Sequence, residues 1–269
     1  RVDGEFAVRA TGSDFSYWRL VAELSEYREL VPGLVLALRA RPGFVKALTE
    51  PAAGLGVHPL KRFFTGGPNS VRGYAQYQLG PKVLTIDAAR FLWADSVSSP
   101  PRGICSKAMI ADSTCNVSKL PSSMFDVRPT GGQAMLEGNI ELRFPLAMSG
   151  KLRGVTFLDY GQLFSTASDF QLRQLVWTPG FGVRYFSAIG PIRVDVGYRP
   201  QGSETLEVLT TNVGRRLADG SVDCSLDPGD GNHVANCGDL RPLKTRLEWP
   251  PNPGFFDHLQ VHFSIGQAF

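Results

Sequence analysis

Residues 139–146 read NIELRFPL, and residues 156–161 read TFLDYG. In both stretches apolar and polar side chains largely alternate, which in an extended chain places them on opposite faces. In the first stretch Glu141 and Arg143 share one face, while the aliphatic side chains and Phe144 share the other. An alternation with a period of two predicts β-strands rather than helices.

The same alternation recurs along the chain, near residues 4–10, 18–24, 34–40, 140–146, 156–161, 183–185, 192–198 and 259–265. No stretch shows a sustained helical period, so we predict an all-β fold with about eight antiparallel strands. Short connections alternate with longer ones, and the two longest cover residues 44–133 and 201–257. This asymmetry is typical of a transmembrane β-barrel with short periplasmic turns and long external loops. Alternation by itself leaves a soluble β-sandwich open.

Composition excludes several classes of protein. The 28 Lys and Arg residues nearly balance the 25 Asp and Glu residues, so we expect no nucleic-acid partner. No apolar run approaches the roughly 18 residues that indicate a transmembrane helix, whereas a spanning β-strand needs only about 9–11 residues, alternate ones facing lipid. The first residues do not form a secretion signal, so we expect the natural N-terminus to lie upstream of Arg1.

Four cysteines lie in the two long connections, as the pairs Cys105 with Cys115 and Cys224 with Cys237. Each pair closes a short polar segment, which predicts two local disulfides in an oxidising space. The alternative is a zinc site, whose paired ligands are usually about two to four residues apart, and neither pair has that spacing. We therefore predict no metal. The sequence also contains no phosphate-binding loop, nucleophile elbow or HExxH string, which predicts a protein that is not an enzyme and needs no cofactor.

A first motif lies at residues 61–74, which read KRFFTGGPNSVRGY. It resembles the sixth external loop of the BamA/TamA superfamily of outer-membrane assembly factors, where the loop folds back into the barrel and its arginine docks on the inner wall. A buried guanidinium needs carboxylate partners, and the glycines permit a tight reversal. The alternative is a glycine-rich turn with a solvated arginine. The resemblance assigns the loop-docking motif to Gly66, Gly67, Val71, Arg72, Gly73 and Tyr74.

A second motif is FLDYG at residues 157–161, which resembles the Phe-x-Asp-x-Gly of the family's thirteenth strand. In the family this aspartate receives the loop arginine. Asp159 points into the barrel lumen if Leu158 faces lipid, and Glu141 points inward by the same argument. The resemblance therefore implies that Arg72 pairs with Asp159, with Glu141 as a second carboxylate. The alternative is that both are lumen charges with other partners.

The third motif is the C-terminus, where residues 259–269 form an expected last strand ending in an aromatic residue. This end resembles the β-signal by which outer-membrane barrels are recognised for assembly. The residues that carry the resemblance are Phe263, Ile265, Gly266 and Phe269. The likeness extends over residues 1–269 and implies strands nine to sixteen of a sixteen-strand barrel, although the insertion at residues 81–130 is unusually long for the family.

The resemblance implies a protein of the bacterial outer membrane that inserts or translocates other proteins. In the implied mechanism, a seam opens between the first and last strands and a client strand pairs with the exposed edge. The implied partners are outer-membrane lipid, unfolded β-barrel or secreted clients, and periplasmic or inner-membrane accessory proteins reached through POTRA domains upstream of Arg1. Two alternatives stay open, a two-partner secretion transporter and a passive structural or adhesive surface barrel.

Overall fold

The computed structural model describes residues 1–48, 57–88, 105–147, 151–188, 190–200, 202–226, 234–251 and 253–266. The chain divides into two compact units, which are described separately below. Unit 1 consists of Arg1–Pro81, Pro129–Gly202 and Pro253–Phe269, and unit 2 consists of Lys82–Arg128 and Ser203–Asn252. Within the described ranges, no helix has both the length and the apolar character needed to cross a membrane.

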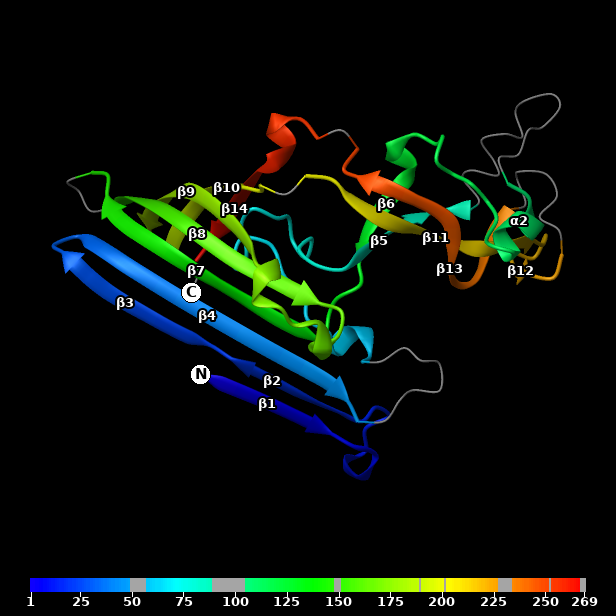
Figure 1. Cartoon of the computed structure of the whole chain (residues 1–269), viewed down its shortest axis with the longest axis horizontal. Helices are drawn as coiled ribbons and strands as arrows, with labels where there is room; N and C mark the ends of the chain where they lie inside the picture. The colour runs from blue at the N-terminus through cyan, green and yellow to red at the C-terminus, as the bar shows by residue number, and fades with distance from the viewer. Residues whose placement is uncertain are drawn as a thin grey trace. The chain divides into compact units, whose positions relative to one another are not determined.

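Unit 1 is built on one antiparallel sheet with the order β1-β2-β4-β7-β8-β9-β10-β14, and β3 pairs with β4 (Figure 1). Because β2 and β3 are separated by Glu23 alone and both pair with β4, they occupy one strand position. The sheet therefore has eight strand positions, and the all-β antiparallel prediction is confirmed. The strands are β1 (Val2–Ala7), β2 (Tyr17–Ala22), β3 (Leu24–Val31), β4 (Leu34–Ala47), β7 (Ala134–Pro145), β8 (Leu152–Phe164), β9 (Val176–Ser187), β10 (Gly190–Tyr198) and β14 (Leu259–Ile265).

The two ends of this sheet are not joined within the described residues. At one end β1 pairs with β2 alone, and at the other end β14 pairs with β10 alone. The ladders between them are long and in regular register, as between β7 and β8, where Asn139 lies opposite Asp159. The described residues therefore form an open antiparallel sheet and not a closed barrel.

The two faces of the sheet have opposite chemistry. On one face large apolar side chains are exposed, including Phe181, Val194, Val261 and Phe263. On the other face ionisable side chains are buried, including Glu137, Glu141, Asp159, Arg184, Arg193 and Asp195. A soluble β-sandwich buries its apolar face, so this arrangement excludes that alternative and matches a sheet whose outer face meets lipid.

Unit 2 is a second sheet, with the order β12-β11-β5-β6 and with β13 paired to β11. Its β5–β11 ladder is parallel, in contrast to the antiparallel pairing expected throughout. Unlike unit 1 it has a conventional apolar core, which includes Leu84, Ile110, Phe125, Val208 and Leu243. Its elements are β5 (Lys82–Ile86), α2 (Lys107–Ala111), β6 (Phe125–Pro129), β11 (Glu204–Arg216), β12 (Val222–Asp223) and β13 (Val234–Trp249).

The two long connections of the sequence analysis thus contain more structure than loops. Residues 44–133 contribute β5 and β6 to unit 2, and residues 201–257 contribute β11, β12 and β13. Both segments contribute to one apolar core, since Leu84 comes from the first segment and Val208 from the second. The segments fold by packing against each other.

Both predicted disulfides are present, and both lie in unit 2. The Cα atoms are 5.5 Å apart in Cys105–Cys115 and 5.7 Å apart in Cys224–Cys237. Lys107 strengthens the contact between the two segments, since its Nζ donates to the carbonyl oxygens of Cys224 and Leu226 at 2.8 and 2.7 Å. Each disulfide therefore cross-links one segment close to the place where the two segments meet.

Candidate functional site

Residues 66–74, which we call the motif loop, form a compact turn against the buried face of unit 1. Gly66 and Gly67 have φ angles of +99° and +112°, a region that side chains other than glycine rarely adopt. The Gly67 amide donates to the carbonyl of Tyr74 at 3.1 Å, and the Ser70 amide donates to the carbonyl of Gly67 at 3.1 Å. The two glycines thus permit the reversal that brings Arg72 to the sheet.

Arg72 is buried and holds Asp159 of β8 in a bidentate pair. Its Nε and Nη2 atoms donate to the two carboxylate oxygens of Asp159 at 2.8 and 2.7 Å. The backbone amide of Arg72 adds a third hydrogen bond to Asp159, at 2.9 Å. The exposed fractions of the two side chains are 1% and 0%, so the pair is shielded from water. Parallel charge-assisted bonds of this kind fix both position and orientation.

Two further carboxylates and one ring surround the guanidinium. Nη1 of Arg72 lies 2.7 Å from Oε1 of Glu141 and 3.6 Å from Oδ1 of Asp195. The guanidinium carbon lies 3.5 Å from the ring centroid of Phe157, within the range of a cation–π contact. The sequence analysis assigned Asp159 and Glu141 to Arg72, and it gave Asp195 and Phe157 no role at the site.

Other arginines balance the carboxylates of this cluster. Glu141 is 3.0 Å from Nη2 of Arg184 and 2.7 Å from Nη2 of Arg143. Arg193 of β10 donates at 2.6 Å to the side-chain oxygen of Asn69, a residue of the motif loop. A buried charge is stable only with partners of opposite sign, so the cluster holds together as a network rather than as one pair.

Several strands bind the backbone of the motif loop. Arg39 of β4 donates to the carbonyl of Asn69 at 3.0 Å, and Asn139 of β7 donates to the carbonyl of Ser70 at 2.8 Å. Asn139 also donates to Asp159 at 2.8 Å, which links the backbone contact to the arginine pair. On the last strand, Nε2 of His262 lies 3.0 Å from the carbonyl oxygen of Arg72. The loop therefore contacts strands from β4 to β14.

The remaining residues of the two internal motifs pack against each other. Val71 and Tyr74 belong to a small buried cluster with Leu79 and Val176. A side chain at Gly161 would place its Cβ 2.7 Å from Cγ2 of Val71, so this glycine leaves the space that the motif loop occupies. The structure thus brings the first and second motifs together.

The predicted β-signal residues lie apart from this cluster, on β14 and just after it. Phe263 and Ile265 are on the exposed apolar face, with 68% and 59% of their surface accessible. Gly266 ends the strand with a φ of +103°. Phe269 lies outside the described residues. The β-signal residues Phe263 and Ile265 therefore contribute to the outer face, whereas His262 of the same strand contacts the motif loop.

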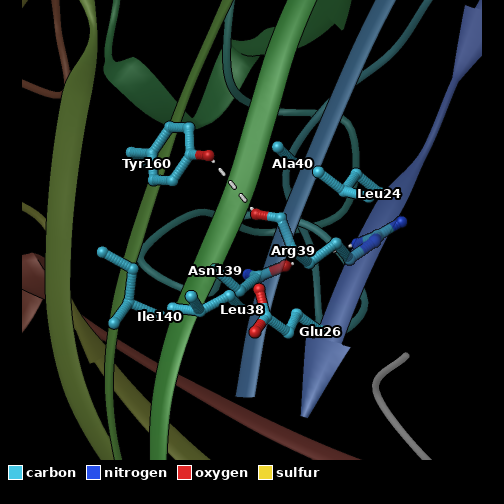
Figure 2. A pocket seen from close by; sticks show the side chains of 8 residues that line it. All are labelled: Leu24, Glu26, Leu38, Arg39, Ala40, Asn139, Ile140 and Tyr160. Atoms are coloured by element: carbon cyan, nitrogen blue, oxygen red, sulfur yellow. Dashed lines mark hydrogen bonds between the residues drawn. The ribbon is translucent and has the colours of Figure 1, made fainter. Parts of the chain in front are cut away.

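The outer face behind the docking site carries an aromatic brace that sequence analysis did not assign. Tyr160 of β8 donates its hydroxyl to the carbonyl of Arg39 on β4 at 3.3 Å, across the intervening strand β7 (Figure 2). Gly138 of β7 makes this possible, because a side chain there would collide with the tyrosine ring. Leu24, Leu38, Ala40 and Ile140 line the pocket beside it, which has a volume of 290 Å³. The brace connects the strands that carry Arg39, Asn139 and Asp159.

The comparison with known structures supports the fold. The chain is similar to the crystal structure of BamA from Haemophilus ducreyi lacking POTRA domains 1-3, with a TM-score of 0.50 and 16% sequence identity. The similarity covers 83% of this chain and 36% of the BamA chain, so this chain spans about a third of that structure. At this identity the likeness concerns the fold alone.

The comparison with protein families concerns the whole sequence. Residues 1–269 match the model of the Omp85 superfamily domain. This match agrees with the apolar outer face and charged inner face of unit 1, and it confirms the resemblance to BamA and TamA drawn from the three motifs. The protein therefore belongs to the Omp85 superfamily of outer-membrane β-barrels, whose members are non-enzymatic assembly or transport proteins.

Proposed function

We propose that the protein inserts or translocates client proteins at the outer membrane through a lateral seam in its barrel, with β14 on one side of the seam. Its clients would be unfolded β-barrel proteins or secreted proteins. Among the described residues β14 is paired with β10 alone. The N–H and C=O groups of an unpaired strand edge are a template for another strand, which supports an exchange between barrel and client at this edge.

The observation that carries this proposal is the docking of Arg72 among the carboxylates of Asp159, Glu141 and Asp195. A loop held this way occupies space on the inward face of the sheet, which favours a route through the wall over an open pore. Burial of these charges costs desolvation free energy, and a passive wall without a docked loop would not incur this cost. We therefore assign the motif loop a working role in the barrel interior.

The proposal can be tested by closing the seam covalently in the full-length protein. One cysteine replaces Gln260 on β14 and a second is placed on the strand facing it, and the amount of folded client barrels in the outer membrane is measured. We expect a tethered protein to lose client assembly and to regain it when the tether is reduced. The single-cysteine variant under the same reducing conditions controls for reduction of the disulfides in unit 2. Full assembly by the tethered protein would overturn the proposal.

A passive surface or adhesive role is the second candidate, and unit 2 is the observation that favours it. Unit 2 has its own apolar core and two disulfides, as small domains exposed to an oxidising space often do. Replacing Lys82–Arg128 and Ser203–Asn252 by short linkers separates the candidates. An insertion factor should keep client assembly after this deletion, whereas an adhesive barrel should lose its surface binding and show no client defect. A two-partner secretion transporter would instead fail to release one secreted client when Arg72 is replaced.

A further inference from the structure

The last strand has a direct tie to the motif loop, through His262. The ring is 8% exposed, and its Nε2 lies 3.0 Å from the carbonyl oxygen of Arg72. Because a carbonyl oxygen only accepts, Nε2 must carry the proton of this hydrogen bond. Gln260 and Ser264 have the same inward parity on β14, and among the described residues neither makes a hydrogen bond to the motif loop. His262 is therefore singled out on its strand.

The neighbouring strand explains why His262 can reach the loop. In the β10–β14 ladder, Asp195 lies opposite His262 and Gly197 lies opposite Gln260. A side chain at Gly197 would place its Cβ 2.5 Å from the carbonyl oxygen of Arg72, so the loop backbone lies directly on β10 at this glycine. This close approach brings the Arg72 carbonyl within reach of the next strand. Arg72 thus contacts Asp159 through its side chain and His262 through its backbone carbonyl.

Arg72 is held more strongly through its side chain than through its backbone carbonyl. The Arg72 side chain is held by charge-assisted bonds to Asp159 and by a second carboxylate, Glu141. The hydrogen bond between His262 and the Arg72 backbone is made to a neutral carbonyl, and such a bond is roughly half as strong as a charge-assisted one. The hydrogen bond to His262 is therefore the weaker of the two contacts of Arg72.

We propose that His262 is a positioning residue that couples the last strand to the docked motif loop and holds the strand until the seam opens. The inference rests on the proposed function, because it treats β14 as one side of the seam. Breaking the His262 bond frees β14 from the loop, while Arg72 stays docked on β8. A shift of the loop at Arg72 would conversely weaken the hold on β14.

The test is amide hydrogen exchange of the full-length protein in lipid discs, without client. We expect His262→Leu to speed exchange in Leu259–Ile265 about fivefold, as the loss of one net hydrogen bond predicts, with β8 unchanged. His262→Gln should restore slow exchange, because its amide nitrogen occupies a place similar to Nε2 and can donate. Ser264→Ala is the matched control on the same strand and face, and it should exchange like the wild type.

The outcomes separate this inference from the proposed function. Wild-type exchange in His262→Leu would overturn the coupling, even if client assembly depends on the seam. Equal acceleration in β8 and β14 would also overturn it, because that pattern indicates general destabilisation. Faster exchange confined to β14, reversed by His262→Gln, would support the coupling. This holds even if the tethering experiment overturned the proposed seam.

Discussion

Asp159 accepts three hydrogen bonds from one residue, Arg72, two from the guanidinium and one from the backbone amide. The backbone bond means that the two partners are not equivalent. A change of Arg72 leaves the amide in place, whereas a change of Asp159 removes every bond and leaves the guanidinium with Glu141 and Asp195. The pair therefore fixes both the side chain and the main chain of the motif loop.

We predict that Asp159→Ala is more damaging than Arg72→Ala in the full-length protein. Removal of one partner of a buried ion pair typically costs about 3–5 kcal/mol, and Asp159→Ala also removes the acceptor of the Arg72 backbone amide. The double variant should be less destabilised than the sum of the single variants, since they share one interaction. Denaturant unfolding of the three variants measures this difference. Strictly additive free energies would show that the pair has no coupling.

Arg72→Lys should also fail to dock the loop. An ammonium group is a point charge and cannot reproduce two parallel bonds from Nε and Nη2 to Asp159. Protease protection of the motif loop reports docking, and Arg28→Lys, a change at an exposed arginine of β3, serves as the control. A docked loop in the lysine variant would show that charge alone is sufficient.

Gly161→Ala should displace the motif loop, because the new Cβ would lie 2.7 Å from Cγ2 of Val71. Overpacking of a filled site typically costs about 1–3 kcal/mol. Val71→Ala in the same chain removes the colliding methyl group and should recover part of the lost stability. Thermal unfolding of the single and double variants tests this pair. If the loss of stability in the double variant equals the sum of the losses in the two single variants, the two residues are not in contact.

Replacement of Cys105 and Cys115 by serine should destabilise unit 2 by about 2–4 kcal/mol, as is usual for the loss of a native disulfide. Non-reducing peptide mapping of the unaltered protein should recover Cys105–Cys115 and Cys224–Cys237. Limited proteolysis should then show faster cleavage in Lys82–Arg128 of the variant. Free thiols in protein purified from cells without reductant would contradict the assignment.

An epitope tag at Asp219 should be reachable by antibody on intact cells. Asp219 lies in the exposed turn between β11 and β12, so an insertion there disturbs no strand. The prediction follows from the expectation that the long connections are external. Labelling that requires permeabilised outer membranes would reverse the orientation of the barrel.

The alternation of side chains predicted the wall of unit 1, because this signal is local, whereas the docking of Arg72 on Asp159 was implied by the resemblance to the BamA/TamA superfamily. Alternation within each strand decides which side chains face inward, and this placed Asp159 and Glu141 correctly. Asp195 lies on the same face by the same rule, but nothing near it in sequence points to a residue more than a hundred positions earlier. His262 was not assigned for the same reason, since its partner is a backbone carbonyl that carries no sequence signal.

Unit 2 was not predicted, although one of its strands carries a local signal. Leu206, Val208 and Thr210 are buried, while Glu207 and Leu209 between them are more exposed, which is typical of a half-buried strand. The polar composition around Asp219 suggested a loop instead. The parallel β5–β11 ladder pairs Val208 with Leu84, and no pattern within either segment specifies that register.

The composite construction of unit 2 sets an order of events in the protein's own assembly. Its first segment precedes β7 and its second follows β10, so four antiparallel strands separate the two halves of its core. An even number of such strands returns the chain to the side of the membrane that it left. Leu84 and Phe125 can meet Val208 and Leu243 only when the chain beyond β10 has reached the same side of the membrane. Completion of the unit 2 core therefore follows delivery of both segments to that side.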